Sequence, residues 1–185
     1  MAARTIQDSR LDPRGRPVIG SHTGTRTVVA DLATGRSCGL WLFAQSGSLE
    51  VLRPGWGRVL TVGAGSTWPG GINPGNGGTV FDGWLWLPVG IHAVTVGAIG
   101  TTGGSSSLGS LVGVPGGAIG DSAGFFAKGA GRGLPGAAAG DGYPSDITGA
   151  VVAYGAYSGP PGAYGNSHGG DLSADPGVVM VRIDL

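Results

Sequence analysis

One short segment has the spacing of a hydrolase nucleophile. Residues 120–124 (GDSAG) match G-x-S-x-G, in which the serine stands on a sharp turn between a strand and a helix and attacks a carbonyl. The base would have to be His168, oriented by Asp171. The flanking residues 114–117 and 125–131 are rich in glycine or proline and predict neither the strand nor the helix. An esterase acting on cell-wall polymers is therefore the least favoured function, and we expect no catalytic residues.

Two further patterns that could bind a cofactor or a metal are weak. Residues 131–136 match G-x-G-x-x-G, but no predicted strand precedes them and Pro135 stands where the helix would begin. In a chain with 41 glycines this pattern is expected by chance. The histidines, His22, His92 and His168, are too scattered to indicate a metal site. We expect no cofactor and no metal.

The aromatic residues indicate a different chemistry, the stacking of rings against a sugar. Trp84 and Trp86 alternate onto one face of a predicted strand, residues 79–87. The favoured interpretation is a core or a subunit interface, and the alternative is a platform for sugar rings. Aromatic residues in predicted loops are better ligand candidates, because loops carry binding residues more often. These are Trp68, Tyr143, Tyr157 and Tyr164.

Short runs rich in β-branched and aromatic residues predict the strands that would position these side chains. They cover residues 26–32, 39–43, 49–53, 58–62, 79–87, 91–96, 146–154 and 178–185. The first two are expected to form a hairpin. Strands 79–87 and 91–96, joined at Pro88-Val-Gly90, are predicted to form the clearest hairpin of the chain. The last run alternates between an apolar and a mixed face, which predicts a half-buried strand.

Glycine dominates residues 97–177, where regular strands are hard to predict. Because glycine lacks Cβ, extended glycine-rich segments can pack closely and bond through their backbones, and polyglycine-II-like packing is one outcome. The sequence predicts an all-β fold, a short-stranded sandwich-like domain with long glycine-rich loops. An extended N-terminal arm and attachment hairpin, residues 1–42, would precede the glycine-rich β domain, residues 43–185.

The composition excludes several classes of function. Charged residues make up 12% of the 185 residues and the net charge is zero, which argues against a nucleic-acid-binding protein. Hydrophobic residues make up 41%, which argues against disorder. No apolar run is long enough to span a membrane and no signal peptide is evident, so we expect synthesis in the cytoplasm. Cys38 is the single cysteine and is expected to be a buried small hydrophobe.

The first residues lean basic, which suggests a contact with a partner protein. Arg4, Arg10, Arg14 and Arg16 are the candidates for docking the chain to a larger particle. A solvated tail is the alternative interpretation. Sparse charge elsewhere removes the usual protection against self-association, which is typical of a part built into an assembly.

Four segments, taken in order, resemble the glycine-rich domain of bacteriophage minor tail and tail-fibre proteins. They are residues 46–65 (SGSLEVLRPGWGRVLTVGAG), 83–98 (GWLWLPVGIHAVTVGA), 103–109 (GGSSSLG) and 176–182 (PGVVMVR). The resemblance covers about 140 residues from Phe43 onward. The chain departs from the family pattern in its fewer poly-glycine runs, its additional tryptophans and Ile183 in place of a closing aromatic.

The resemblance implies a structural protein of the virion tail, commonly in a threefold tail tip or fibre, without catalytic residues. Its implied partners are copies of itself in a homotrimer and other tail proteins. A host cell-surface glycan is a further expected partner, through the loop aromatics. A small glycan-binding or capsid-decorating module is the alternative function.

Overall fold

The computed structural model describes residues 15–67, 77–117, 142–155, 164–165 and 174–185. Within these ranges the chain forms strands and no helix. The strands are β1 (Val18–His22), β2 (Thr25–Ala30), β3 (Ser37–Phe43), β4 (Gly47–Arg53), β5 (Gly55–Val62), β6 (Val80–Leu87), β7 (Gly90–Thr95), β8 (Ser106–Leu108), β9 (Val112–Val114), β10 (Tyr143–Ser145), β11 (Val152–Tyr154) and β12 (Val178–Asp184).

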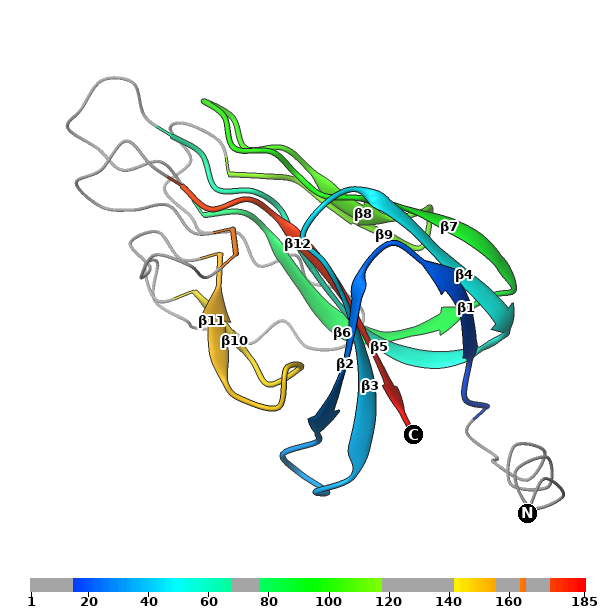
Figure 1. Ribbon diagram of the computed structural model, residues 1–185. Helices are drawn as coiled ribbons and strands as arrows, with labels where there is room; N and C mark the ends of the chain where they lie inside the picture. The colour runs from blue at the N-terminus through cyan, green and yellow to red at the C-terminus, as the bar shows by residue number, and fades with distance from the viewer. Residues whose placement is uncertain (1–14, 68–76, 118–141, 156–163, 166–173) are drawn as a thin grey trace, which may run out of the picture.

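Two five-stranded antiparallel sheets form a sandwich, which confirms the predicted all-β architecture (Figure 1). The first sheet has the order β1-β4-β7-β8-β9 and the second the order β2-β3-β12-β5-β6. Alternating apolar residues of both sheets meet between them and exclude water. Leu49, Val51 and Val94 come from the first sheet, and Phe43 and Val181 from the second.

A third sheet, the β10–β11 hairpin, covers part of the outer face of the second sheet. Tyr143 and Tyr154 of the hairpin pack with Leu60 and Met180 in a second apolar core. The sequence predicted one strand over residues 146–154. The structure instead has a turn that begins at Asp146, where Gly149 adopts a positive φ of 80° and bonds back to the Asp146 carbonyl. This turn leaves a short strand on each side of it.

Strand β12 lies in the middle of the second sheet, between β3 and β5. The predicted alternation is correct, since Val179 and Val181 face the inter-sheet core while Val178 and Met180 face the second core. The predicted half-burial is wrong. The β10–β11 hairpin covers the mixed face, so even Arg182 is only 3% exposed.

The predicted hairpin around Pro88 is wrong. Strand β6 pairs with β5 and strand β7 pairs with β4, so Pro88 and Val89 carry the chain from one sheet to the other. Pro54 makes the same change of sheet between β4 and β5. The proline and glycine residues predict a turn whether the next strand stays in the same sheet or joins the other one. Which sheet the next strand joins depends on long-range packing.

The first strands belong to the same two sheets as the rest of the chain. The predicted hairpin at the N-terminal side is confirmed as β2–β3. However, β1 pairs with β4 and β3 pairs with β12 over six residues of register. Residues 18–43 are therefore part of the sandwich. The attachment role expected of residues 1–42 stays a prediction.

Beyond the ends of the sheets, extended glycine-rich segments run together at one end of the molecule (Figure 1). We call this the glycine bundle; it comprises residues 63–65, 78–79, 97–98, 103–104, 115–117, 165 and 175–177. Residues 63–65 bond through their backbones to four other segments, with partners Thr79, Gly104, Gly117 and Asp175. A strand of a flat sheet has only two bonded neighbours, so these segments form a bundle and not a sheet.

The bundle depends on residues without side chains. Ala64 donates to Gly104, Gly103 donates to Gly117 and Gly117 donates to Ala64, which closes a triangle of backbone bonds of 2.8–3.0 Å. A Cβ on Gly103 would overlap the Ala64 carbonyl, and one on Gly97 would overlap the Gly104 carbonyl. This is the close backbone packing expected from the glycine content.

Candidate functional site

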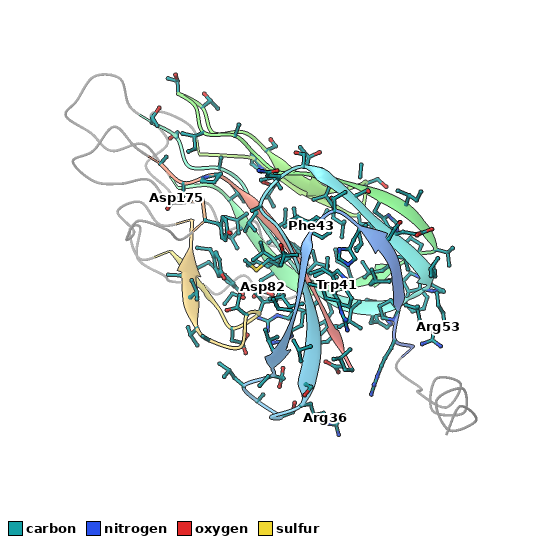
Figure 2. The ribbon with its side chains drawn as sticks, in the orientation of Figure 1. Arg36, Trp41, Phe43, Arg53, Asp82 and Asp175 are labelled. Atoms are coloured by element: carbon teal, nitrogen blue, oxygen red, sulfur yellow. The ribbon has the colours of Figure 1, made fainter. Side chains whose placement is uncertain are left out.

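The candidate site is a pocket on the outer face of the second sheet, beside the β10–β11 hairpin. The register of the strands sets its floor, because Arg182 of β12 lies opposite Arg58 of β5 and Arg58 lies opposite Trp84 of β6. The pocket has a volume of about 460 Å³. It is lined by Asp31, Ala33, Thr34, Arg36, Arg58, Asp82, Gly83, Trp84, Tyr143, Asp146, Arg182 and Asp184. Figure 2 shows Asp82 between the hairpin and the sheet, and Arg36 at the β2–β3 turn.

Arg58 is held by two carboxylates. Its Nε and Nη2 donate to the two oxygens of Asp82 at 2.8 and 2.7 Å, and its Nη1 donates to Asp146 Oδ1 at 2.5 Å. Ser145 Oγ donates to Asp82 Oδ2 at 2.6 Å. The bidentate pairing fixes the guanidinium plane, so these groups form a rigid hydrogen-bonded floor.

Arg182 is held by the β2–β3 turn. Its Nη2 donates to Asp31 Oδ2 at 2.7 Å, and its Nη1 donates to the Asp146 carbonyl at 3.3 Å. The other oxygen of Asp31 accepts from the backbone N–H groups of Ala33 and Thr34 and from the Thr34 hydroxyl. The bonds within the turn thus fix the orientation of Asp31, so that its second oxygen can accept from Arg182. Asp146 bonds to both Arg58 and Arg182 and therefore links the two arginines.

The charge state of the site follows from these contacts. Burial alone would lower the pKa of Arg58, but its bonds to Asp82 and Asp146 outweigh burial and raise it. Burial alone would raise the pKa of Asp146, and Arg58 outweighs it and lowers the pKa. The Thr34 hydroxyl, the Thr34 backbone N–H and then Arg182 lower the pKa of Asp31 against the opposing effect of burial. These groups are therefore charged at neutral pH.

Cys38 lies beneath the rim of the pocket and is fully buried, as predicted. Its Sγ lies 3.5 Å from Asp184 Oδ1. Burial, with the neighbouring Asp184 carboxylate, raises the pKa of the Cys38 thiol. The thiol is therefore protonated at neutral pH and is a weak nucleophile.

Three tryptophans continue the same outer face. Trp84 is 50% exposed and forms one wall of the pocket. Trp56 lies opposite Trp86 in the register, and their rings meet edge to face with centroids 5.7 Å apart. Both rings are about half exposed. Trp84 and Trp86 are therefore not core residues of the chain, which leaves a subunit interface or a ligand platform.

The predicted ligand aromatics occupy different environments. Tyr143 lies on β10 and not in a loop; it is buried in the second core but lines the pocket. Tyr164 packs against the second core. Trp68 and Tyr157 lie outside the described residues. Their ligand role stays a prediction.

Most of the other predicted candidates also lie outside the described residues. These are Arg4, Arg10, Arg14, His168, Asp171, and the two glycine motifs at residues 120–124 and 131–136. Arg16 is described, and its carbonyl accepts a bond of 3.2 Å from Arg53 Nε. His22 and His92 bond to the carbonyls of Gly24 and Pro88. No cluster that could hold a metal is found among the described residues.

The charged residues of the pocket were not identified from the sequence. A signal was present, because Arg58, Asp82 and Arg182 each interrupt an otherwise apolar strand. A charged residue inside such a strand must be paired when it is buried. Asp31 and Asp146 come from turns, where polar residues are ordinary, and the sequence carried no comparable signal for them.

The site offers an aromatic wall beside a fixed row of guanidinium and carboxylate groups. Such an arrangement can orient a small ligand through hydrogen bonds and ring contacts.

Comparisons with protein-family models, with curated proteins and with solved structures found no match. The described part of the chain contains no helix that is long and apolar enough to cross a membrane.

Proposed function

We propose that this chain is a non-enzymatic structural component of a phage tail, a minor tail, tail-tip or fibre protein. The observation that carries the proposal is the glycine bundle, in which residues 63–65 bond to four neighbouring segments through backbone groups alone. Such a bundle gives a domain rigidity from hydrogen bonds where its charged surface is sparse. A rigid domain with few surface charges suits a protein that is assembled permanently into a particle and carries mechanical load.

The position of the four phage-like motifs in the fold supports the proposal. Residues 46–65 and 83–98 each run along strands and end in the glycine bundle, while residues 103–109 and 176–182 each begin in it. Gly177 bonds to the Gly97 carbonyl and Ala64 to the Gly104 carbonyl, so the ends of the motifs meet. The motifs thus specify a single structural feature, which makes a chance resemblance a poorer explanation.

The proposal includes assembly as a homotrimer with other tail proteins, and the location on the tail is the decisive test. Antibodies raised against the purified chain should label the tails of phage particles in electron micrographs, and the native mass of the chain should be that of a trimer. Labelling of the capsid surface, or no labelling of particles that contain the chain, would contradict the tail role. A monomer would contradict the trimer alone.

A second candidate function is a small glycan-binding or capsid-decorating module. The half-exposed Trp56, Trp84 and Trp86 favour it, because exposed tryptophans beside a polar pocket are typical of ligand surfaces. A monomer that binds sugar and labels no tail would support this function against the first.

A further inference from the structure

We infer that the outer face of the second sheet, from the polar pocket to the three tryptophans, binds a neutral saccharide. This deepens the recognition role within the proposed function, because it names the ligand class and moves the site from the loops to the sheet. We call this surface the tryptophan face; it comprises Trp56, Trp84, Trp86 and the pocket beside them.

The aromatic part of the face suits the apolar side of a sugar ring. The C–H groups on one side of a pyranose form a flat apolar surface that packs on an aromatic ring. Trp84, Trp86 and Trp56 each leave about half of their surface exposed, on adjacent strands and on one side of the sheet. Exposed tryptophan rings grouped in this way mark a binding surface.

The polar part of the face suits sugar hydroxyls. Asp146 uses Oδ1 for Arg58, which leaves Oδ2 as an acceptor, and its side chain is 30% exposed. Asp184 accepts only from the weak Cys38 thiol donor among the described residues. Arg36 is exposed at the rim and supplies donors. Carboxylates and a guanidinium around a pocket can accept from and donate to neighbouring hydroxyls of one sugar.

The nearly balanced charge of the pocket favours a neutral sugar over an anion as the ligand. Three guanidiniums and four carboxylates line the pocket, so their charges nearly cancel. The donors of Arg58 are already directed at Asp82, Asp146 and Ser145. A phosphate or sulfate would need an arginine that its carboxylates leave unpaired, and Arg58 and Arg182 are both paired. Arg36 at the exposed rim would then have to hold the anion alone, in a pocket that four carboxylates line. The volume of about 460 Å³ suits a mono- or disaccharide.

The test measures binding of sugars to the purified full chain. The probes are glucose, galactose, mannose, rhamnose, N-acetylglucosamine, maltose, lactose and cellobiose, each titrated while tryptophan fluorescence and calorimetric heat are followed. We expect at least one probe to bind and to shift the fluorescence. Trp84→Ala and Asp146→Asn should each weaken that binding by about tenfold or more. Inorganic phosphate should not bind.

Two matched controls locate the site. Ile91→Ala removes an apolar side chain, 73% exposed, from the other sheet and should leave binding unchanged. Trp68→Ala combined with Tyr157→Ala removes two of the predicted loop aromatics and should also leave it unchanged. Each variant is checked for a cooperative thermal transition, which shows that it is folded, and Trp84→Phe should restore part of the affinity lost in Trp84→Ala.

Several results would overturn the inference. One is that no probe binds at millimolar concentration; another is that phosphate binds in place of a sugar. A third is that the loop variant loses binding while Trp84→Ala keeps it. If Trp84→Ala instead changes the native mass without affecting sugar binding, the tryptophan face is an interface with a second copy. The tail role is tested separately, by antibody labelling of phage particles. If the chain binds a sugar but is absent from tails, the tail role is contradicted and the saccharide site is not.

Discussion

Arg58 and Arg182 are like charges on adjacent strands, and their coexistence depends on the carboxylates around them. Asp82 is 2% exposed and Arg58 is 16% exposed in their side chains, so the pair has lost most of its hydration. Removal of one partner from such a pair is more costly than removal of both, since an unpaired charge remains buried. The pair therefore matters more for the order of the pocket than for net stability.

The substitution Asp82→Asn should lower the free energy of unfolding by about 3–5 kcal/mol, because it leaves Arg58 without its bidentate partner. Urea denaturation measures the change. The double variant Asp82→Leu with Arg58→Met should recover much of the loss, while Arg36→Gln at the exposed rim should change stability by about 0.5 kcal/mol or less. A loss below about 1 kcal/mol in the single variant would show that the pair is solvated.

Acid should destabilise the protein through Asp31 and Asp146. Both carboxyls start from an ordinary pKa of 3.8, and the fold lowers each pKa. Because the unfolded chain binds these protons more readily, their contribution to stability is present above about pH 4 and is lost as the pH falls below it. The urea midpoint should therefore drop in that range. The double variant Asp31→Asn with Asp146→Asn should show a shallower drop, and an equally steep one would assign the effect to other carboxyls.

At the scale of elements, the glycine bundle replaces side-chain packing by backbone contact. Gly63, Gly97, Gly103 and Gly116 each lie where a Cβ would overlap a neighbouring backbone carbonyl. The bundle can therefore accept alanine at these positions only by moving whole segments apart. This makes glycine here a requirement of the packing, in addition to the freedom it gives to turns.

Gly103→Ala should destabilise the protein by about 1–3 kcal/mol, as overpacking of an interior does. Gly113→Ala is the matched control, because a Cβ there would make an ordinary contact of 3.5 Å with Ser107 on an exposed strand. Thermal denaturation followed by circular dichroism compares the two. Equal transition temperatures for the two variants would mean that the glycine bundle accommodates the added methyl group without loss of stability.

The sequence was sufficient to predict most strands but not the way they combine. Alternation along residues 178–184 and the pairing of Trp84 with Trp86 on one face could be predicted, because both depend on neighbouring residues. The pocket could not be predicted, because it depends on the register between β12 and β5 that places Arg182 opposite Arg58. The turn at Pro88 was misassigned since a local turn signal does not specify which sheet the next strand joins.

At the scale of the whole molecule, β12 joins every packed layer. It pairs with β3 and β5, contributes Val179 and Val181 to the core between the sheets, and contributes Val178 and Met180 to the core beneath the hairpin. Strands β3, β5 and β6 also contribute buried residues to both cores, and β12 holds the central position among them. The two cores should therefore be lost together in one cooperative transition.

Deletion of residues 178–185 should abolish folding, because it removes the central strand and part of both cores. The deletion variant should show an unfolded circular dichroism spectrum and no thermal transition. Deletion of residues 1–14 alone should leave the transition in place. A folded product without β12 would show that the two sheets are stable independently of their shared strand.

The position of β12 also constrains the order of events during synthesis. Strand β5 ends at Val62 and β12 begins at Val178, so both neighbours of the central strand leave the ribosome long before it does. Until then, the facing edges of β3 and β5 carry unsatisfied backbone groups, the kind of edge on which nascent chains join one another. Expression of this chain should therefore depend on chaperones and on translation speed far more than its final stability suggests.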